Sequence, residues 1–377
     1  MEYQRLGDYI REVNVRNREL KVTKLVGLTI DKAFIPSVAN VIGTDLSNYK
    51  VIRREQFACS LMQVSRDGKI PVAMFEEDKA IMSPAYPMFE VVDKTVLLPQ
   101  YLMMWFSRSE FDREASYYAV GGVRGSLTWE DFCNMKLPVP DIARQREIVA
   151  KYETLTNRIR LNEQMIAKLE ATAQAMYRKM FVDGVDTEDL PEGWRRGAIG
   201  EFCKEMKSGG TPSRTHTEYW NKKEIPWLKS GEIHNNIVFS VDEYISQAGL
   251  NNSSAKIISK GAVTMAMYGA TAAQVAYLDC DTTTNQACCN MICYSKEDAA
   301  YLFFHLLANQ GDIKKLANGG AQENLSQELI AQQPILLFDD NEKKAVFVPI
   351  LDNLIVKYRE NLKLTELQSL LLARMGK

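Results

Sequence analysis

The chain has 377 residues, of which 46% are hydrophobic and 25% are charged, and its formal net charge is −2. This length suits two domains of ordinary size with connecting structure, and the composition is typical of a soluble globular protein. The charge excludes a general attraction for polyanions, so any nucleic-acid binding must depend on local patches.

No apolar run approaches the roughly 18 residues that span a bilayer, and the start, MEYQRLGDYIREVNVRN, has no apolar segment of a secretory signal. We therefore expect a cytoplasmic protein without membrane contact. The seven cysteines have no paired CxxC spacing, which favours reduced thiols over disulfides or a zinc site. The three histidines leave little for metal chemistry, so no metal site is predicted.

Residues 1–141 alternate apolar and polar residues in short runs, such as TVLLPQYLMMWF, which are interrupted by Gly, Asn, Asp and Pro. This pattern predicts a β-rich mixed head with a few short helices. Near its end, GGVRGSLTWEDF places Thr128 at the N-cap position of a short helix, with Asp131 at capping-box spacing. An extended strand is expected to follow this helix.

Residues 142–184 follow Asp141, a suitable N-cap, and contain no Gly or Pro as far as position 181. The segment predicts one long helix of about 60 Å. Its apolar residues recur at alternating steps of four and three, which is typical of a coiled-coil seam. The seam residues expected to pack on a partner helix are Leu155, Ile159, Ile166, Leu169 and Met176.

Residues 185–338 predict a second head, and residues 339–377 predict a second long helix that begins or kinks near Pro349. The seam residues of this helix are Leu354, Leu364, Leu367 and Leu371. Two long apolar seams in one chain are buried most simply by packing against each other. If a pseudo-two-fold axis relates the two halves of the chain, the two helices pair in opposite directions. The alternative is that each helix packs on its own head.

The second half of the chain repeats the first in the same order. RLGDYI at 5–10 corresponds to AIGEFC at 198–203, YLMMWF at 101–106 to YLFFHL at 301–306, and GGVRGSLTWEDF at 121–132 to GGAQENLSQELI at 319–330. In the second copy Leu329 stands where Asp131 stands in the first, so Ser326 must cap its helix alone. The predicted fold is α/β (α+β): two β-rich mixed heads separated by two long antiparallel coiled-coil helices, forming an internal pseudo-two-fold repeat.

Six phrases of the second head occur in a fixed order: LPEGW (190–194), SGGTPSRTHTEYW (208–220), IPWLKSGEI (225–233), MYGAT (267–271), TTNQACC (283–289) and GGAQENLSQELI. Through them the chain resembles, over essentially its full length, the specificity (S) subunits of Type I restriction-modification systems. The resemblance implies two target-recognition domains, 1–141 and 185–338, which alternate with the helical spacers 142–184 and 339–377. It also implies a non-catalytic subunit that reads a bipartite, asymmetric target in double-stranded DNA.

The same resemblance implies that the spacers recruit two methyltransferase and two restriction subunits. S-adenosylmethionine, ATP and Mg²⁺ would belong to those partners, with no cofactor in this chain. The sequence itself has no GxxxxGK[ST], GxGxxG, HExxH or Asn/Asp-Pro-Pro-aromatic motif, so no catalytic residue is predicted. Two alternatives remain open: a coiled-coil scaffold whose heads bind protein or a small ligand, and an autonomous enzyme such as a nuclease.

Reading base edges requires hydrogen-bonding side chains on a rigid scaffold, with cations and backbone N–H groups for phosphates. In the second head the predicted DNA-binding residues are Lys207, Ser208, Thr211, Ser213, Arg214, Tyr219, Lys229, Ser230, Tyr268, Thr271, Gln322 and Asn324. In the first head they are Ser65, Arg66, Lys69, Arg124 and Ser126. Arg124 occupies the place of Gln322, and arginine prefers guanine where glutamine prefers adenine. The alternatives are solvated polar loops, ordinary hairpin turns and contacts to phosphate alone.

Overall fold

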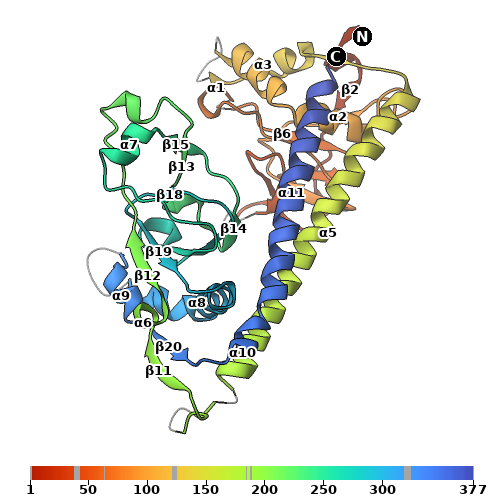
Figure 1. Cartoon of the computed structure of the whole chain (residues 1–377). Helices are drawn as coiled ribbons and strands as arrows, with labels where there is room; N and C mark the ends of the chain where they lie inside the picture. The colour runs from red at the N-terminus through yellow and green to blue at the C-terminus, as the bar shows by residue number, and fades with distance from the viewer. Residues whose placement is uncertain are drawn as a thin grey trace. The chain divides into compact units, whose positions relative to one another are not determined.

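The computed structural model describes residues 2–37, 43–62, 64–120, 125–183, 185–186, 189–317 and 324–376 (Figure 1). The chain forms two compact units, one from Met1–Ile159 with Lys363–Lys377 and the other from Arg160–Leu362. Both long helices contribute to both units, because α5 covers Ile142–Phe181 and α11 covers Val348–Arg374. Each unit therefore contains one head and a segment of each long helix.

The head of the first unit is built from short strands and short helices. Its strands are β1 (Tyr3–Arg5), β2 (Ile10–Glu12), β3 (Val26–Leu28), β4 (Phe34–Pro36), β5 (Lys50–Arg53), β6 (Phe57–Cys59), β7 (Val72–Met74), β8 (Lys79–Met82), β9 (Met88–Val91) and β10 (Lys136–Pro138). Its helices are α1 (Val64–Asp67), α2 (Pro99–Phe106), α3 (Ser109–Ala119), α4 (Trp129–Asn134) and the 3₁₀ turns η1 (Leu6–Asp8) and η2 (Leu46–Asn48). One sheet has the order β2-β9-β6-β7, and the remaining strands pair as β1-β10, β3-β4 and β5-β8.

Aromatic side chains fill the core of this head. Phe57 and Phe89 lie opposite each other on β6 and β9 and stack with ring centroids 5.0 Å apart. Phe106 of α2 meets both rings edge-on, and Phe132 of α4 packs against Phe89. All four side chains are fully buried, and each burial of this kind stabilises a fold by roughly 1.5–3 kcal/mol. The sheet, α2 and α4 therefore share one core.

The head of the second unit has a larger sheet. Its strands are β11 (Arg195–Ala198), β12 (Glu205–Ser208), β13 (Ile225–Leu228), β14 (Asn236–Val238), β15 (Glu243–Ile245), β16 (Val263–Ala266), β17 (Val275–Leu278), β18 (Thr283–Thr284), β19 (Cys288–Ile292) and β20 (Pro334–Leu337). Its helices are α6 (Ile199–Phe202), α7 (Gln247–Asn251), α8 (Lys296–Leu316), α9 (Gln327–Ala331), α10 (Asn341–Ala345) and the 3₁₀ turns η4 (Thr217–Tyr219), η5 (Ser230–Glu232) and η6 (Gly269–Thr271). The sheets have the orders β12-β19-β16-β17-β14, β15-β13-β18 and β11-β20.

α8 is the central helix of the second head and packs on β16 and β17. Its side chains from Asp298 to Leu306 are all buried, which explains why YLFFHL is apolar on every face rather than along one stripe. Cys288 and Cys289 on β19 are also buried and act as small hydrophobic side chains.

Equivalent strands make equivalent contacts in the two heads. β1 pairs with β10 and β11 pairs with β20, both antiparallel. The buried hydroxyl of Tyr101 donates to the carbonyl of Pro138, and that of Tyr301 donates to the carbonyl of Leu336, each at 3.2 Å. Together with the two mixed heads and the two long helices, these contacts confirm the predicted fold class and internal repeat.

The caps before the last strand of each head are those that the sequence predicts. Thr128 and Asp131 form a capping box at the start of α4. Ser326 caps α9, where Leu329 replaces the acidic residue of a capping box, by accepting a hydrogen bond of 3.1 Å from the backbone N–H of Leu329. Strands β10 and β20 follow these helices directly, as predicted.

The two spacer helices begin differently. α5 runs for 40 residues without interruption, whereas the second spacer starts with α10 and resumes as α11, which has 27 residues. Pro349 lies in the first turn of α11, where its missing N–H removes no intrahelical hydrogen bond. The restart near Pro349 agrees with the sequence prediction.

Within each unit, the segments of α5 and α11 lie side by side in opposite directions. In the first unit the amide of Gln368 donates to Thr156 Oγ1 at 2.7 Å. In the second unit the amide of Asn162 donates to Asn361 Oδ1 at 2.9 Å. Asn361 follows Asn162 by 199 positions, close to the offset of the repeat, so both helices contribute the same repeat position. A polar pair in an otherwise apolar seam favours one register over its alternatives.

Most predicted seam residues face the partner helix or the adjoining core. Ile166 and Leu354 are buried, and Leu169 and Met176 pack against the same core. The half-buried members are Leu155, Ile159, Leu364 and Leu371. Leu367 is more exposed than the other members, with 49% of its side chain accessible, and it lines a hollow between the two helices together with Leu155.

The joints between head and spacer carry different polar groups at equivalent positions. Gln145 near the start of α5 is fully buried, accepts from the backbone N–H of Leu98 at 2.9 Å and donates to the carbonyl of Val96 at 2.7 Å. Lys344 of α10, 199 positions later, instead pairs with Asp298 of α8 at 2.8 Å. These two charged side chains are only 9% and 11% exposed.

Candidate nucleic-acid interface

One end of the sheets in the second head gathers polar residues from five segments that are distant in sequence. The end of β12, the end of β16 and the start of β19 lie at this end, as the pairs Ser208 with Cys289 and Ala266 with Cys288 show. The loop after β13 and the segment before α9 join them. We call this surface the rim and define it by Ser208, Ser230, Tyr268, Thr271, Gln286 and Asn324.

Hydrogen bonds hold the predicted members of the rim together. Thr271 donates its hydroxyl to the carbonyl of Ser230 at 3.0 Å. Tyr268 and Asn324 form an antiparallel bridge. Both side chains are exposed, and among the described residues neither the Tyr268 hydroxyl nor the Asn324 amide has a hydrogen-bond partner. These two groups are therefore available to a ligand.

The sequence analysis missed Gln286, which lies at the exposed tip of the turn between β18 and β19. The hydroxyl of Thr211 donates to its Oε1. In the sequence TTNQACC (283–289), an Asn-Gln pair separates two apolar or β-branched runs. Since Asn favours turns, this pair indicates a turn with Gln286 at its tip. Of the two partners, the sequence predicted only Thr211 as a DNA-binding residue.

The predicted cations of the second head are neutralised by acids. Arg214 lies with its guanidinium carbon 3.4 Å from the ring centroid of Trp220 and pairs with Glu243 at 2.7 Å. Lys229 pairs with the other oxygen of Glu243 at 3.1 Å, and Lys207 pairs with Glu205 at 2.8 Å. The locally basic sequence therefore does not form an open basic patch through these three side chains.

Sharing the Glu243 carboxylate also shifts the pKa values of Glu243 and Lys229. Burial acts to raise the pKa of Glu243, but hydrogen bonds from Arg214 and Lys229 outweigh it, and the pKa of Glu243 falls below its usual value. The hydrogen bond to Glu243 raises the pKa of Lys229. Glu243 and Lys229 therefore stay charged at neutral pH.

Two other predicted residues of the second head serve its local structure. Ser213 shares a hydrogen bond of 2.8 Å with Thr215, and its carbonyl accepts from the indole N–H of Trp220. Tyr219 stacks on His216 with ring centroids 4.9 Å apart. These contacts order the loop between β12 and β13 beside Arg214.

In the first head, Ser65 and Arg66 lie on the short helix α1. Arg66 pairs with Asp67 at 2.7 Å, and Lys69 pairs with Asp31 at 3.2 Å. The side chain of Ser126 is half-buried. The predicted residues Arg124 and Gln322 lie outside the described residues.

α1 and the segment before α4 approach each other closely. Gly125 has a φ of +71°, and a Cβ there would lie 2.0 Å from Ser65 Oγ, so only glycine fits. The backbone N–H of Leu127 donates to the carbonyl of Leu61 at 2.8 Å, as Leu325 donates to Met267 at 2.9 Å in the second head. Both heads therefore bring the segment after their Gly-Gly pair to the loop that follows a central strand.

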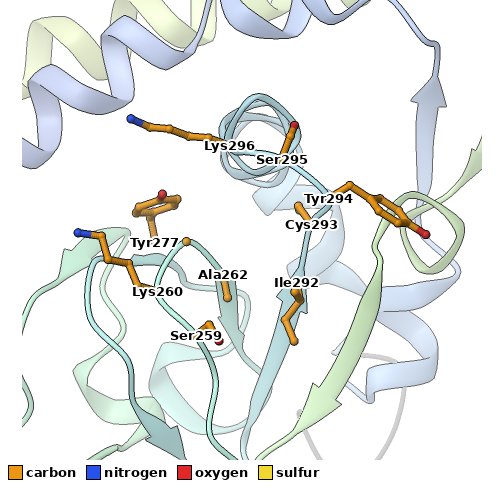
Figure 2. A pocket seen from close by; sticks show the side chains of 10 residues that line it. Ser259, Lys260, Ala262, Tyr277, Ile292, Cys293, Tyr294, Ser295 and Lys296 are labelled. Atoms are coloured by element: carbon orange, nitrogen blue, oxygen red, sulfur yellow. The ribbon is translucent and has the colours of Figure 1, made fainter.

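A cavity of about 350 Å³ in the second unit lies away from the rim, between β17, β19 and the start of α8. Figure 2 shows Lys260 and Lys296 extending on the same side of it, where Tyr277 also lies. Both amino groups are engaged, Lys260 by Asp279 at 2.8 Å and Lys296 by Asp352 at 2.5 Å. The ion pair between Lys296 and Asp352 joins this side of the cavity to α11, so the two lysines serve the packing of the head on that helix.

Within the described ranges, no three His, Cys, Asp or Glu side chains are grouped so as to hold a metal ion. Burial raises the pKa of the Cys288 thiol to about 12, so it stays protonated at neutral pH. Searching the described residues for a helix that could cross a membrane finds none of sufficient length and apolarity.

Comparison with known proteins assigns the family. The Type I restriction modification DNA specificity domain matches residues 64–171 and 191–369, one stretch in each copy of the repeat. The chain belongs to this family, as the resemblance in its sequence predicted. Its role is therefore the recognition of DNA sequence as a specificity subunit, which is itself not catalytic.

Two curated relatives have the same role in their names. The chain is 27% identical over 378 residues to the Type I restriction enzyme HindI specificity subunit of Haemophilus influenzae, which covers 79% of this chain and 81% of the relative. It is 24% identical over 310 residues to the EcoR124I/EcoR124II specificity subunit of Escherichia coli, covering 76% and 72%.

The fold is also that of a solved structure. The S subunit of a Type I restriction-modification system from M. genitalium superposes with a TM-score of 0.60 at 12% identity, covering 100% of this chain and 96% of that one. At this identity the likeness supports the fold alone.

Replacing Glu243 by glutamine is expected to strengthen binding to DNA of random sequence, because Arg214 and Lys229 lose the carboxylate that they share. The slope of log K against log salt should steepen by about 0.9 for each additional phosphate that the two cations neutralise. Binding of the full chain at a series of salt concentrations measures this slope.

The matched control is Asp312→Asn, which removes the same charge from an exposed pair with Lys315 on α8. A slope that steepens equally in both variants would show that only net charge has changed and that Arg214 and Lys229 do not face DNA.

Proposed function

We propose that each head binds one half of a bipartite, asymmetric target in double-stranded DNA, and that the two spacer helices set the separation of the halves. The heads are residues 1–141 and 185–338, and the spacers are residues 142–184 and 339–377. A rigid helical spacer suits this role because half-sites on one face of the duplex lie about 34 Å or a multiple apart.

The internal repeat carries this proposal. The two heads share their strand pairing and their capped helices, yet they differ at equivalent loops: α1 in the first head carries Ser65 and Arg66, whereas the hairpin after β16 in the second carries Tyr268 and Thr271. One scaffold used twice with different side chains is what reading two unlike half-sites requires.

The proposed DNA contacts are the rim and the residues near it. In the second head they are Lys207, Ser208, Thr211, Ser213, Arg214, Tyr219, Lys229, Ser230, Tyr268, Thr271, Gln322 and Asn324. In the first head they are Ser65, Arg66, Lys69, Arg124 and Ser126. Uncharged rim residues suit base edges, and the cations suit phosphates once DNA replaces their acidic partners.

Membership of the family supports the proposal of a wider assembly. We propose that two methyltransferase and two restriction subunits join this chain in the cytoplasm, where the target DNA lies. S-adenosylmethionine, ATP and Mg²⁺ would be bound by those partners. The chain itself would supply recognition and geometry.

Exchanging residues 1–140 for the corresponding head of another family member is expected to change one half of the target and leave the other intact. The boundary precedes Asp141, which caps α5 by accepting from the backbone N–H of Arg144 at 2.9 Å, so the spacer keeps its own cap. Sequencing the methylated adenines in DNA exposed to the assembled methyltransferase identifies both halves.

The reciprocal chimera, with residues 185–338 exchanged, serves as the matched control and should change the other half. A change in both halves from either exchange contradicts independent heads. If the wild-type assembly selects no sequence at all, the heads bind something other than a DNA target, as in a scaffold protein.

A further inference from the structure

We infer that Gln286, held in position by Thr211, reads an adenine in the half-site bound by the second head. The inference rests on the proposed function and adds a specificity-determining residue to it. It depends on three observations: a fixed backbone on both sides of the pair, an oriented amide, and nearby cations that are paired with acids.

The backbone that carries Thr211 is fixed by close contacts. A Cβ on Gly209 would lie 2.2 Å from the carbonyl oxygen of Thr284, and a Cβ on Gly210 would lie 2.3 Å from Ser254 Oγ, so two adjacent glycines let this segment pass between its neighbours. Gly210 then donates to the carbonyl of Thr284 at 2.8 Å.

The carbonyl of Gly210 is held as well. It accepts at 2.9 Å from the indole N–H of Trp227, whose side chain is buried. Thr211 directly follows Gly210, whose backbone N–H and carbonyl are both hydrogen-bonded. The Thr211 hydroxyl therefore projects from a fixed segment of backbone.

The turn that carries Gln286 is fixed in the same way. Asn285 donates its backbone N–H to the carbonyl of Leu228 at 3.0 Å, and its side-chain oxygen accepts from the N–H of Ala287 at 3.2 Å. Cys288 closes the turn by donating to the carbonyl of Asn285. Gln286 is the exposed tip of this turn, with its neighbours on both sides tied down.

Thr211 orients the Gln286 amide. Because Oε1 accepts the Thr211 hydroxyl, the amide has one free acceptor position on Oε1 and its N–H groups directed to other partners. An acceptor beside a donor matches the major-groove edge of adenine, where the N6 amino group donates and N7 accepts. An orientation fixed before binding also lowers the conformational entropy lost when DNA is bound.

The surroundings favour base edges over phosphates. All six rim residues are uncharged, and the nearby cations Arg214 and Lys229 are paired with Glu243. Phosphate contacts are made chiefly by cations and carry no sequence information, whereas amides in a groove do.

The first head has a different side chain at this turn. β9 begins at Met88 as β19 begins at Cys288, and the central pairs Phe57 with Phe89 and Met265 with Cys289 align the two sheets. Tyr86 therefore occupies the place of Gln286, and it packs against the core. Substituting Gln286 should consequently alter one half-site only.

The test selects duplexes from a random library with the full chain assembled with its methyltransferase partner. In Gln286→Ala, we expect discrimination for adenine at one position of one half-site to fall by roughly 10- to 100-fold. Thr211→Val should weaken discrimination at the same position, and Thr211→Ser, which keeps the hydroxyl, should restore it. Gln332→Ala, at an exposed glutamine beyond the C-terminal end of α9, should select the wild-type sequence.

The outcomes distinguish the proposed function from the role of Gln286. If the wild-type assembly selects no sequence, the proposed function fails. If it selects one and Gln286→Ala selects the same one with equal stringency, only the reading role of Gln286 fails. Loss of discrimination at a guanine, cytosine or thymine of the same strand would overturn the assignment to adenine.

Discussion

Replacing Lys344 by methionine is expected to destabilise the second unit by about 3–5 kcal/mol, because Asp298 is left buried without its counter-charge. The carboxylate cannot turn to water, since Asp298 lies in the first turn of α8 and also accepts from Ser295 at 3.0 Å. Denaturant unfolding, with hydrogen exchange of the α8 amides to localise the effect, measures the loss.

The neighbouring Lys343→Met serves as the matched control. Lys343 is 44% exposed and pairs with Asp340 at 3.4 Å, so its loss should cost less than about 1 kcal/mol. The double variant Lys344→Met, Asp298→Leu should recover most of the stability, because the first head tolerates Leu98 at the equivalent position. Equal losses in the single and double variants would mean that packing, and not the unpaired charge, causes the effect.

The second unit is expected to lose about 3 kcal/mol of stability as the pH falls from 6.5 to 4, through His305. Burial lowers the pKa of His305 to about 4, while a hydrogen bond with the backbone of Pro334 acts in the opposite direction. Between these two pH values the unfolded chain binds a proton that the folded chain does not, so stability is complete above pH 6.5 and declines toward pH 4.

The structure explains why the neutral ring is favoured. The hydroxyl of Tyr177 on α5 shares a hydrogen bond of 2.6 Å with Nδ1 of His305. In the tautomer that carries its proton on Nε2, the hydroxyl donates to an unprotonated Nδ1. Replacing His305 by phenylalanine should remove the decline between pH 6.5 and 4 and lower the stability at neutral pH, because Tyr177 loses its partner. Replacing the exposed His216 by glutamine should leave the decline unchanged, and a decline that persists in His305→Phe would assign it to other groups.

The sequence predicted the elements whose signals are local. Thr128 and Ser326 were recognised as caps because an N-cap needs only a hydroxyl at a fixed spacing from the first turn. α5 is unbroken because its segment contains no proline, and α11 restarts at Pro349 because proline is tolerated only in the first turn of a helix. The repeat was visible because two copies confirm each other, although neither copy alone predicts its strands well.

The features that depend on three-dimensional partners were not predicted. Leu367 has apolar spacing along α11 and lines a hollow with Leu155 of α5, but the degree to which its side chain is exposed depends on how the two helices cross, which the spacing does not report. The basic character near Arg214 was read from neighbours in sequence, whereas Glu243 comes from a different strand. Gln286 gains its orientation from Thr211, 75 positions earlier in the chain, and no local pattern reports that contact.

The two junctions between head and spacer differ in their polar contacts, with neutral Gln145 at the first and charged Lys344 at the second. This difference has a consequence for the exchange of heads between chains. A first head moved to the second place would set Leu98 against Lys344, and a second head moved to the first place would set Asp298 against Gln145. Exchange between related chains at the same place preserves each match, whereas exchange between places within one chain leaves a charge uncompensated at the joint. We therefore expect a new head to be tolerated more readily as a replacement in the same position, where it meets the joint that it matches.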